Sequence, residues 1–154
     1  MKNSNSLPDI LIVGCGDIGV RVAQLEKQAG RKVSGLVRSE EGAAASLRNR
    51  IQPVMGTLDD LTSLNDLPTG GKLIYYFAPP TGGGPFDSRM RSFCQAVNAG
   101  LLPDKVVYMS TSGVYGDCGG EWVTEETPLN PQTSRAQRRV DAETTLQEWG
   151  REHS

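Results

Sequence analysis

The stretch DILIVGCGDIG, residues 9–19, places three glycines directly after a short apolar segment. Residues 9–13 have the composition of a buried strand, and apolar residues then recur at helical spacing up to about Gly30. A GxGxxG pattern is a weak signal alone, but its place between a strand and a helix makes it far more specific. The stretch therefore predicts a strand, a tight turn and a helix, with the turn built on Gly14, Gly16 and Gly19.

Each glycine of this turn has its own expected role. Gly14 permits the tight turn, Gly16 lets a pyrophosphate approach the backbone, and Gly19 lets the helix pack closely on the strand. The helix begins at Asp17 and Ile18, where unpaired N–H groups and the positive end of the helix dipole favour phosphate. We therefore predict that these five residues bind a dinucleotide cofactor. The alternative is that the glycines serve only a turn.

Apolar strands alternate with helices along the rest of the chain. Strands are expected at residues 9–13, 32–37, 51–55, 72–78 and 105–110, and later helices at 40–50, 61–67, 86–100 and 132–149. Because the strands are uniformly apolar, they favour a parallel sheet covered on both faces. We predict an α/β fold, a doubly wound Rossmann sheet with strand order 3-2-1-4-5. The chain stops where a sixth strand should follow, so residues 1–154 are expected to form an NAD(P)-binding domain that lacks the C-terminal strands and the substrate-binding part.

Charge and composition exclude several classes of protein. The 154 residues carry a net charge of −2, which argues against a nucleic-acid partner. The single histidine, His153, nearly rules out a Ser-His-Asp hydrolase or a multi-histidine site, and no metal is expected. No apolar run approaches the ~20 residues that span a bilayer, and the first residues lack the apolar core of a signal peptide. We therefore expect a cytoplasmic protein with no membrane partner.

The three cysteines are Cys15, Cys94 and Cys118, and none forms a CxxC pair. Three reduced thiols are the simplest interpretation. Cys15 is also a candidate redox sensor, because it lies near a helix N-terminus, where a thiolate is favoured.

The end of the second strand bears on the choice of cofactor. An acid at this place holds the ribose hydroxyls of NAD, whereas here Arg38 and Ser39 follow the strand. A guanidinium can pair with a 2′-phosphate and a hydroxyl can add a hydrogen bond, so the sequence favours NADP, with NAD as the second choice. The alternative is that Arg38 is only a solvated strand-end arginine, with Glu40 and Glu41 close by.

Three further segments resemble a known family: FAPP at residues 77–80, STSGVYG at 110–116 and ETPLNPQ at 126–132. From about residue 10 to residue 143 the chain resembles the extended short-chain dehydrogenase/reductase superfamily, in its NAD-dependent epimerase/dehydratase branch, which acts on nucleotide sugars. The resemblance implies that Thr111 hydrogen-bonds the reacting oxygen of the substrate. It also implies further cofactor contacts from Leu58, Ala78, Pro79 and Ser110.

The chain departs from the family pattern at the last helix. The family carries Tyr-x-x-x-Lys there, but the alignment places Arg135 and Arg139 at these positions. Arginine keeps its proton and cannot be the acid/base, although Arg139 could still bind a ribose or a phosphate. Tyr115 is a substitute candidate for the acid/base, with a role in loop structure as the alternative. Arg135, Arg138 and Arg139 share one helical face, which is either an anion site or a solvated surface.

Two functions follow from these patterns. The first is the NAD(P)-binding domain of an atypical nucleotide-sugar epimerase- or dehydratase-like oxidoreductase, acting on a small molecule such as a sugar nucleotide. The second is a non-catalytic dinucleotide-binding module that reports cofactor state to a partner. The missing tyrosine favours the second, the glycine turn fits both, and a homodimer is compatible with either.

Overall fold

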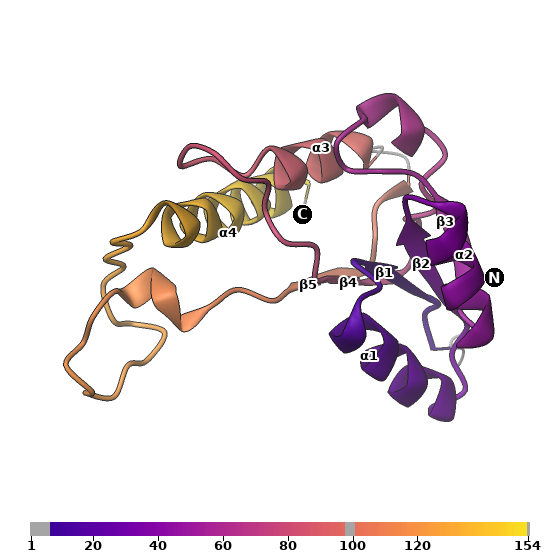
Figure 1. The fold of residues 1–154 in the computed structure, drawn as a ribbon, viewed down its shortest axis with the longest axis horizontal. Coiled ribbons are helices and arrows are strands. Elements are labelled where there is room, and N and C mark those ends of the chain that lie inside the picture. Colours follow the sequence, from indigo (N-terminus) through magenta and orange to yellow (C-terminus); the bar gives the residue numbers. More distant parts are fainter. Residues whose placement is uncertain (1–6, 98–100, 154) are drawn as a thin grey trace. The chain divides into compact units, whose positions relative to one another are not determined.

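The computed structural model describes residues 7–97 and 101–153 and contains a five-stranded parallel sheet (Figure 1). The strands are β1 (Ile10–Val13), β2 (Val33–Val37), β3 (Gln52–Met55), β4 (Leu73–Tyr76) and β5 (Lys105–Tyr108). They pair in the order β3-β2-β1-β4-β5, which confirms the predicted doubly wound order. In this register Ile10 lies between Val33 of β2 and Leu73 of β4.

The helices largely follow the predicted pattern. They are α1 (Asp17–Gln28), α2 (Glu40–Arg48), α3 (Ser88–Ala96) and α4 (Ser134–Glu152), with 3-10 turns η1 (Leu61–Leu64) and η3 (Ser112–Tyr115). The helix expected to reach residue 100 ends at Ala96, and residues 98–100 lie outside the described residues. The last helix begins later than predicted because Thr133 caps it, its hydroxyl accepting a hydrogen bond from the Ala136 N–H.

The chain divides into two compact units. Residues 1–79 and 96–109 form the first, which carries the sheet with α1 and α2. Residues 80–95 and 110–154 form the second, which carries most of α3 and all of η3 and α4.

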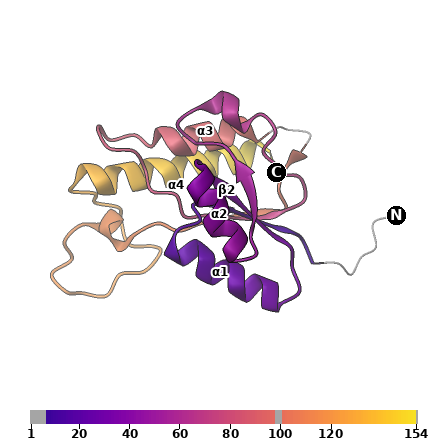
Figure 2. The same cartoon turned by 45° about the vertical axis from the view of Figure 1, so that its right-hand side comes forward.

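The core of the first unit is centred on β1. All four residues of this strand are fully buried, and Ile10 and Ile12 pack with Ala23 of α1, Val33 of β2 and Ile51. Helix α1 packs along β1 and β2, and α2 packs along β2 and β3 (Figure 2). Side chains of successive strand residues point to opposite faces of the sheet, so the burial of all four shows that β1 is covered on both faces, which explains why its residues are uniformly apolar.

In the second unit, α3 and α4 are joined by a buried carboxylate network. Asp87 is fully buried and caps α3, because its Oδ1 accepts hydrogen bonds from the N–H groups of Arg89 and Met90. The Asp87 N–H donates to Asp141 Oδ2 on α4 at 2.7 Å. The Arg91 guanidinium donates to both Asp141 oxygens, at 2.5 and 2.8 Å. Asp141 therefore ties the start of α3 to the middle of α4.

The two carboxyl groups of this network have opposite pKa shifts. Burial raises the pKa of Asp87, and this outweighs the hydrogen bonds from Met90 and Arg89 and the positive charge of Arg139. Burial also acts to raise the pKa of Asp141, but the Arg91 and Asp87 hydrogen bonds and the Arg91 charge outweigh it and lower that pKa. Asp141 is thus held ionised in the folded protein.

Replacing Asp141 should destabilise the protein in a pH-dependent way. We expect Asp141→Asn to lower the unfolding free energy by about 1–2 kcal/mol at pH 7, the lower part of the range for charged hydrogen bonds, because the Arg91 side chain is 43% exposed. A carboxyl group with a lowered pKa stabilises the fold at neutral pH, and this contribution is lost as the pH falls through the folded pKa. Urea unfolding should therefore show a difference between variant and wild type that shrinks below about pH 4.

The matched control is Glu143→Gln, which removes a carboxylate on the same helix and should change stability by less than about 0.5 kcal/mol. Equal stability of Asp141→Asn and wild type at pH 7 would show that the network contributes nothing.

Candidate functional site

The glycine turn after β1 has the geometry that its sequence predicts. Gly14 adopts a φ of +103°, and a Cβ there would lie 2.5 Å from the Ala78 nitrogen. A Cβ on Gly19 would lie 2.6 Å from the Gly14 carbonyl oxygen, so α1 can pack this closely only through a glycine. Gly16 differs from both, since its φ is −76° and a Cβ there would meet nothing within 4 Å. The turn is closed at Gly14 and Gly19 and open at Gly16.

The first turn of α1 faces open space. Gly16 caps the helix without any side-chain hydrogen bond to its N–H groups. Ile18 is 44% exposed, and the exposed Asp17 pairs with Arg21 on the next turn at 3.0 Å. An exposed helix N-terminus with free N–H groups is the feature that binds phosphate groups. The Asp17 carboxylate interacts favourably with the positive end of the helix dipole, and Arg21 partly neutralises its charge.

The extension of β4 lies against this turn. The N–H groups of Phe77 and Ala78 both donate to the Val13 carbonyl oxygen, at 2.7 and 3.0 Å. Ala78 is buried beside Gly14, and Pro79 is exposed. The structure thus brings two predicted cofactor residues to the carboxyl end of β1.

Arg38 and Ser39 follow β2 at the same edge of the sheet. Both are exposed, and Ser39 caps α2 because its Oγ accepts a hydrogen bond from the Gly42 N–H at 3.1 Å. That hydroxyl keeps its own proton for donation to a ligand. Leu58, in contrast, is buried after β3, so its side chain belongs to the packed interior.

The surroundings of Cys15 weigh against the redox-sensor hypothesis, because the thiol is partly buried in the core of the first unit. Its Sγ fills the space above Gly35 of β2, where a Cβ would lie 2.3 Å away. Burial raises the pKa of the Cys15 thiol to about 11, so burial outweighs any effect of the nearby helix N-terminus. Sequence reasoning missed Gly35, although a lone glycine inside a strand is a known sign of close packing.

In the second unit, Thr111 and Tyr115 bracket η3. The Thr111 hydroxyl accepts a hydrogen bond from the Gly113 N–H at 3.3 Å, so it caps this 3-10 turn. Ser110 Oγ is buried and has no hydrogen-bond partner among the residues that the structure describes. Tyr115 is half-buried, and the following Gly116 is pressed against Asn130, where a Cβ would lie 2.4 Å from its carbonyl oxygen.

The three arginines of α4 have different surroundings. Arg135 is exposed, whereas Arg138 donates from Nη1 to the Gly84 carbonyl oxygen at 2.8 Å. Arg139 is half-buried, and its charge acts on the buried carboxyl group of Asp87. They are therefore not one solvated face. The sequence did not predict the contact between Asp87 and Asp141, because it joins two helices that are far apart in the chain.

Two classes of feature are missing from residues 7–97 and 101–153. No group of three or more His, Cys, Asp or Glu side chains there is placed to hold a metal ion. No helix in this part of the chain is both long enough and apolar enough to cross a membrane.

No family model and no curated protein matches this sequence, but many solved structures share its fold. A UDP-galactose 4-epimerase superposes with a TM-score of 0.77 at 19% identity, over 93% of this chain and 52% of its own. The UDP-glucuronic acid 4-epimerase of Bacillus cereus, in complex with NAD, gives 0.68 at 21% identity, over 93% and 52%. A short-chain dehydrogenase/reductase superfamily protein from Agrobacterium tumefaciens, with bound NAD, gives 0.69 at 22% identity, over 90% and 44%.

This chain therefore has the Rossmann fold of epimerases and of short-chain dehydrogenase/reductase superfamily proteins. It spans about half the length of these solved structures.

The burial of Cys15 makes its reactivity testable. At pH 8, we expect iodoacetamide to modify Cys15 at least ~100-fold more slowly in the folded protein than in urea, because a pKa of about 11 leaves very little thiolate. Peptide mass mapping after timed quenching measures the rate at this one site. Equal rates in the folded and unfolded protein would contradict the buried position of the thiol.

Proposed function

We propose that this chain is the NAD(P)-binding domain of an atypical nucleotide-sugar epimerase- or dehydratase-like oxidoreductase. The observation that carries the proposal is the open space at Gly16, next to a helix N-terminus without a side-chain cap at the carboxyl end of β1. Ligands of doubly wound sheets bind at this edge. The residues present fit a dinucleotide, because Gly16 leaves the backbone accessible and α1 offers N–H groups to its pyrophosphate.

The proposed contacts follow the carboxyl edge of the sheet. Gly14, Gly16, Asp17, Ile18 and Gly19 would cradle the pyrophosphate, and Ala78 and Pro79 would border the cofactor where β4 ends. Leu58 would contribute through its backbone near the adenine, because its side chain is buried. When bound, such a cofactor supplies hydride transfer at its nicotinamide ring.

We propose NADP as the preferred cofactor, ahead of NAD. The exposed Arg38 can form a bidentate ion pair with a 2′-phosphate, and the Ser39 hydroxyl can donate to the same group. No carboxylate follows directly at the end of β2, where it would repel that phosphate. Glu40 and Glu41 follow in the first turn of α2, where their carboxylates interact favourably with the helix dipole.

The second unit carries the residues proposed for the chemistry. Ser110 has a buried hydroxyl oxygen that lacks a partner among the described residues, which suits a cofactor contact. Thr111 is exposed and would orient the reacting group of a small molecule such as a sugar nucleotide. Arg135 cannot transfer a proton, so Tyr115 is the remaining candidate acid/base, while Arg139 would bind a ribose or a phosphate.

One observation favours a second function, a dinucleotide-binding module without catalysis. The Thr111 hydroxyl caps η3, a role that needs no reaction, and Arg135, which cannot transfer a proton, stands where the family carries its acid/base. A homodimer and a cytoplasmic location stay predictions from the sequence.

A valine at Gly16 should abolish dinucleotide binding without unfolding the protein. A Cβ there meets no protein atom, and the φ of −76° suits any residue, but the side chain would occupy the space of the pyrophosphate. Isothermal titration calorimetry with NADPH should show at least ~100-fold weaker binding, with an unchanged circular dichroism spectrum.

The control is Gly150→Val on α4, where a Cβ also meets nothing within 4 Å. It should bind NADPH as the wild type does. If the Gly16→Val protein is folded and binds NADPH with wild-type affinity, the glycines serve only to form the turn and do not bind the cofactor.

Replacing Arg38 should remove the cofactor preference. We expect the wild type to bind NADPH at least tenfold more tightly than NADH, because a charged hydrogen bond contributes ~1.5–3 kcal/mol in a favourable site. Arg38→Ala should weaken NADPH binding by about that factor and leave NADH binding unchanged, as measured by calorimetry. A preference for NADPH that survives Arg38→Ala would exclude this residue as its cause.

A further inference from the structure

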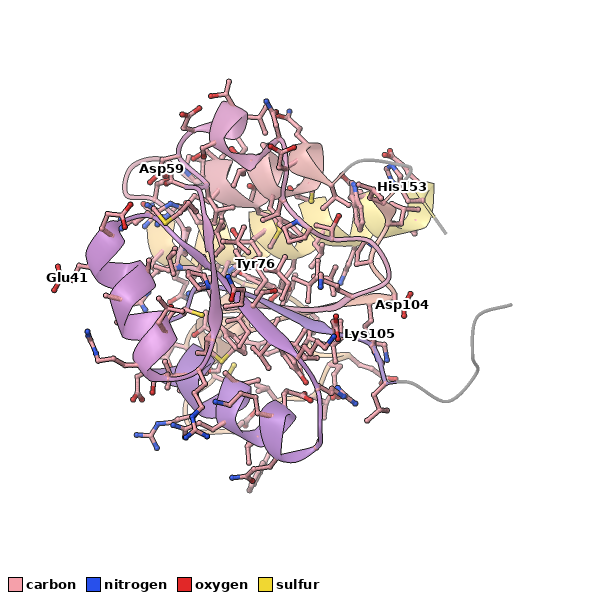
Figure 3. The ribbon with its side chains drawn as sticks, turned by 90° about the vertical axis from the view of Figure 1, so that its right-hand side faces the viewer. Glu41, Asp59, Tyr76, Asp104, Lys105 and His153 are labelled. Atoms are coloured by element: carbon pink, nitrogen blue, oxygen red, sulfur yellow. The ribbon has the colours of Figure 1, made fainter. Side chains whose placement is uncertain are left out.

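A basic pocket opens at the edge of the sheet opposite to the glycine turn. Figure 3 shows both ends of the strands. Asp104 and Lys105 mark the amino end, where β5 begins, and Asp59 marks the carboxyl end, after β3; they lie on opposite sides of Tyr76 in this view. The pocket has a volume of about 630 Å³ and lies where β1, β2 and β3 begin and where α1 and α2 end. Its charged lining residues are Asp9, Lys27, Arg31, Lys32, Arg50 and Lys72.

The charge of this pocket is opposite to that of the whole chain. Five cationic side chains and one carboxylate line it, whereas the protein has a net charge of −2. The pocket is therefore a local concentration of positive charge, which low-dielectric walls strengthen.

Three of the five cations already have protein partners. Lys27 donates to the Asn49 carbonyl oxygen at 2.6 Å, and Lys72 lies 3.9 Å from Asp9. Arg31 pairs with Glu26 at 2.9 Å, yet its Nε is buried with no hydrogen-bond partner among the described residues. The positive charges of these three side chains therefore have a role in stabilising the fold.

The other two cations, Lys32 and Arg50, are exposed and have no such role. Within residues 7–97 and 101–153, neither side chain forms an ion pair or a hydrogen bond. Cations often stabilise the carbonyl end of a helix, but these two donate to none of those carbonyl groups. Their charge is available to a ligand.

The backbone at Arg50 adds an independent observation. Helices α1 and α2 both end in a Schellman motif, in which the residue after the cap adopts a left-handed conformation. In α1 that residue is Gly30, with a φ of +83° and hydrogen bonds from Gly30 to Lys27 and from Arg31 to Glu26. In α2 the matching hydrogen bonds run from Arg50 to Leu47 and from Ile51 to Ser46, and the residue is Arg50 at +56°.

A glycine is the residue that adopts this conformation without strain, as α1 demonstrates. An arginine in the left-handed region costs about 1–2 kcal/mol in conformational energy. Strain of this kind, kept at the rim of a charged pocket, is a feature of binding sites. The hydrogen bonds at the end of α2 explain the left-handed backbone at Arg50, but they do not explain why a cation stands there in place of a glycine.

We propose that this pocket binds a compact polyanion, smaller than a dinucleotide, that carries two or more phosphate groups. The volume lies within the range of small-molecule sites, and several converging cations require more than one negative charge to be matched. The site is separate from the proposed dinucleotide site and does not depend on it, because it is built from the opposite edge of the sheet. Its occupant would bind while the glycine turn is free or filled.

The test uses inorganic tripolyphosphate, titrated calorimetrically into the protein at low salt. We expect the double substitution Lys32→Gln and Arg50→Gly to weaken binding about 100-fold, or about tenfold for each cation removed. The same variant should bind NADPH as the wild type does. Gly16→Val should show the reverse, with tripolyphosphate still bound at the basic pocket.

Stability and position are controlled separately. Arg50→Gly removes the left-handed strain, so its melting temperature should equal or exceed that of the wild type, and a loss of binding cannot be attributed to unfolding. Arg48→Gln removes an exposed cation two residues away that does not line the pocket, and should change tripolyphosphate affinity less than threefold.

Three results would overturn the proposal. The first is that the wild type does not bind tripolyphosphate, and the second is that the Lys32→Gln and Arg50→Gly protein binds it with unchanged affinity. The third is that Arg48→Gln loses as much affinity as that double variant, which would indicate a general attraction by positive charge and no defined site. Failure of NADPH to bind would refute only the proposed function and would leave these outcomes unaffected.

Discussion

The close approach of helix α1 to the turn that precedes it is the constraint on which the rest of the first unit depends. A Cβ on Gly19 would lie 2.6 Å from the Gly14 carbonyl oxygen, so any larger residue would push the helix away from the strand. Gly14 in turn passes so close to Ala78 that it must lack a side chain. These contacts set the N-terminus of α1 over the carboxyl end of β1 and leave Gly16 as the one glycine of the GxGxxG turn with open space around it.

The two edges of the sheet can attract anions for different physical reasons. At the carboxyl edge, the N-terminus of α1 presents backbone N–H groups, so a phosphate site needs few charged side chains. At the amino edge, α1 and α2 present their carbonyl ends, which repel an anion. An anion site there must be built from side-chain cations, and the concentration of lysine and arginine in the basic pocket, with a strained Arg50, meets that requirement.

The sequence predicted the strands because their apolar runs are short-range patterns, although β3 and β5 are less buried than those runs suggested. The uniformly apolar run of β1 indicated a central strand, and it lies between β2 and β4. The glycine turn was predictable because the close approach of Gly19 to Gly14 lies within the motif itself, although the contact of Gly14 with Ala78 is tertiary. The contacts of Asp141 with Arg91 and Asp87 were not predictable, because they join residues about 50 positions apart. The surroundings of Cys15 were not predictable for the same reason: its position near a helix N-terminus is local, whereas its packing against Gly35 is tertiary.

The measurement that tests the central claim most directly is a ¹H–¹⁵N correlation spectrum of the labelled protein during titration with NADPH. The account predicts that the largest shift changes fall on the amide groups of Gly14 to Gly19, with further changes at Arg38, Ser39 and Ala78, while the amides around Lys32 and Arg50 stay unchanged. Shifts confined to the amino edge of the sheet, or no shifts at millimolar NADPH, would contradict it.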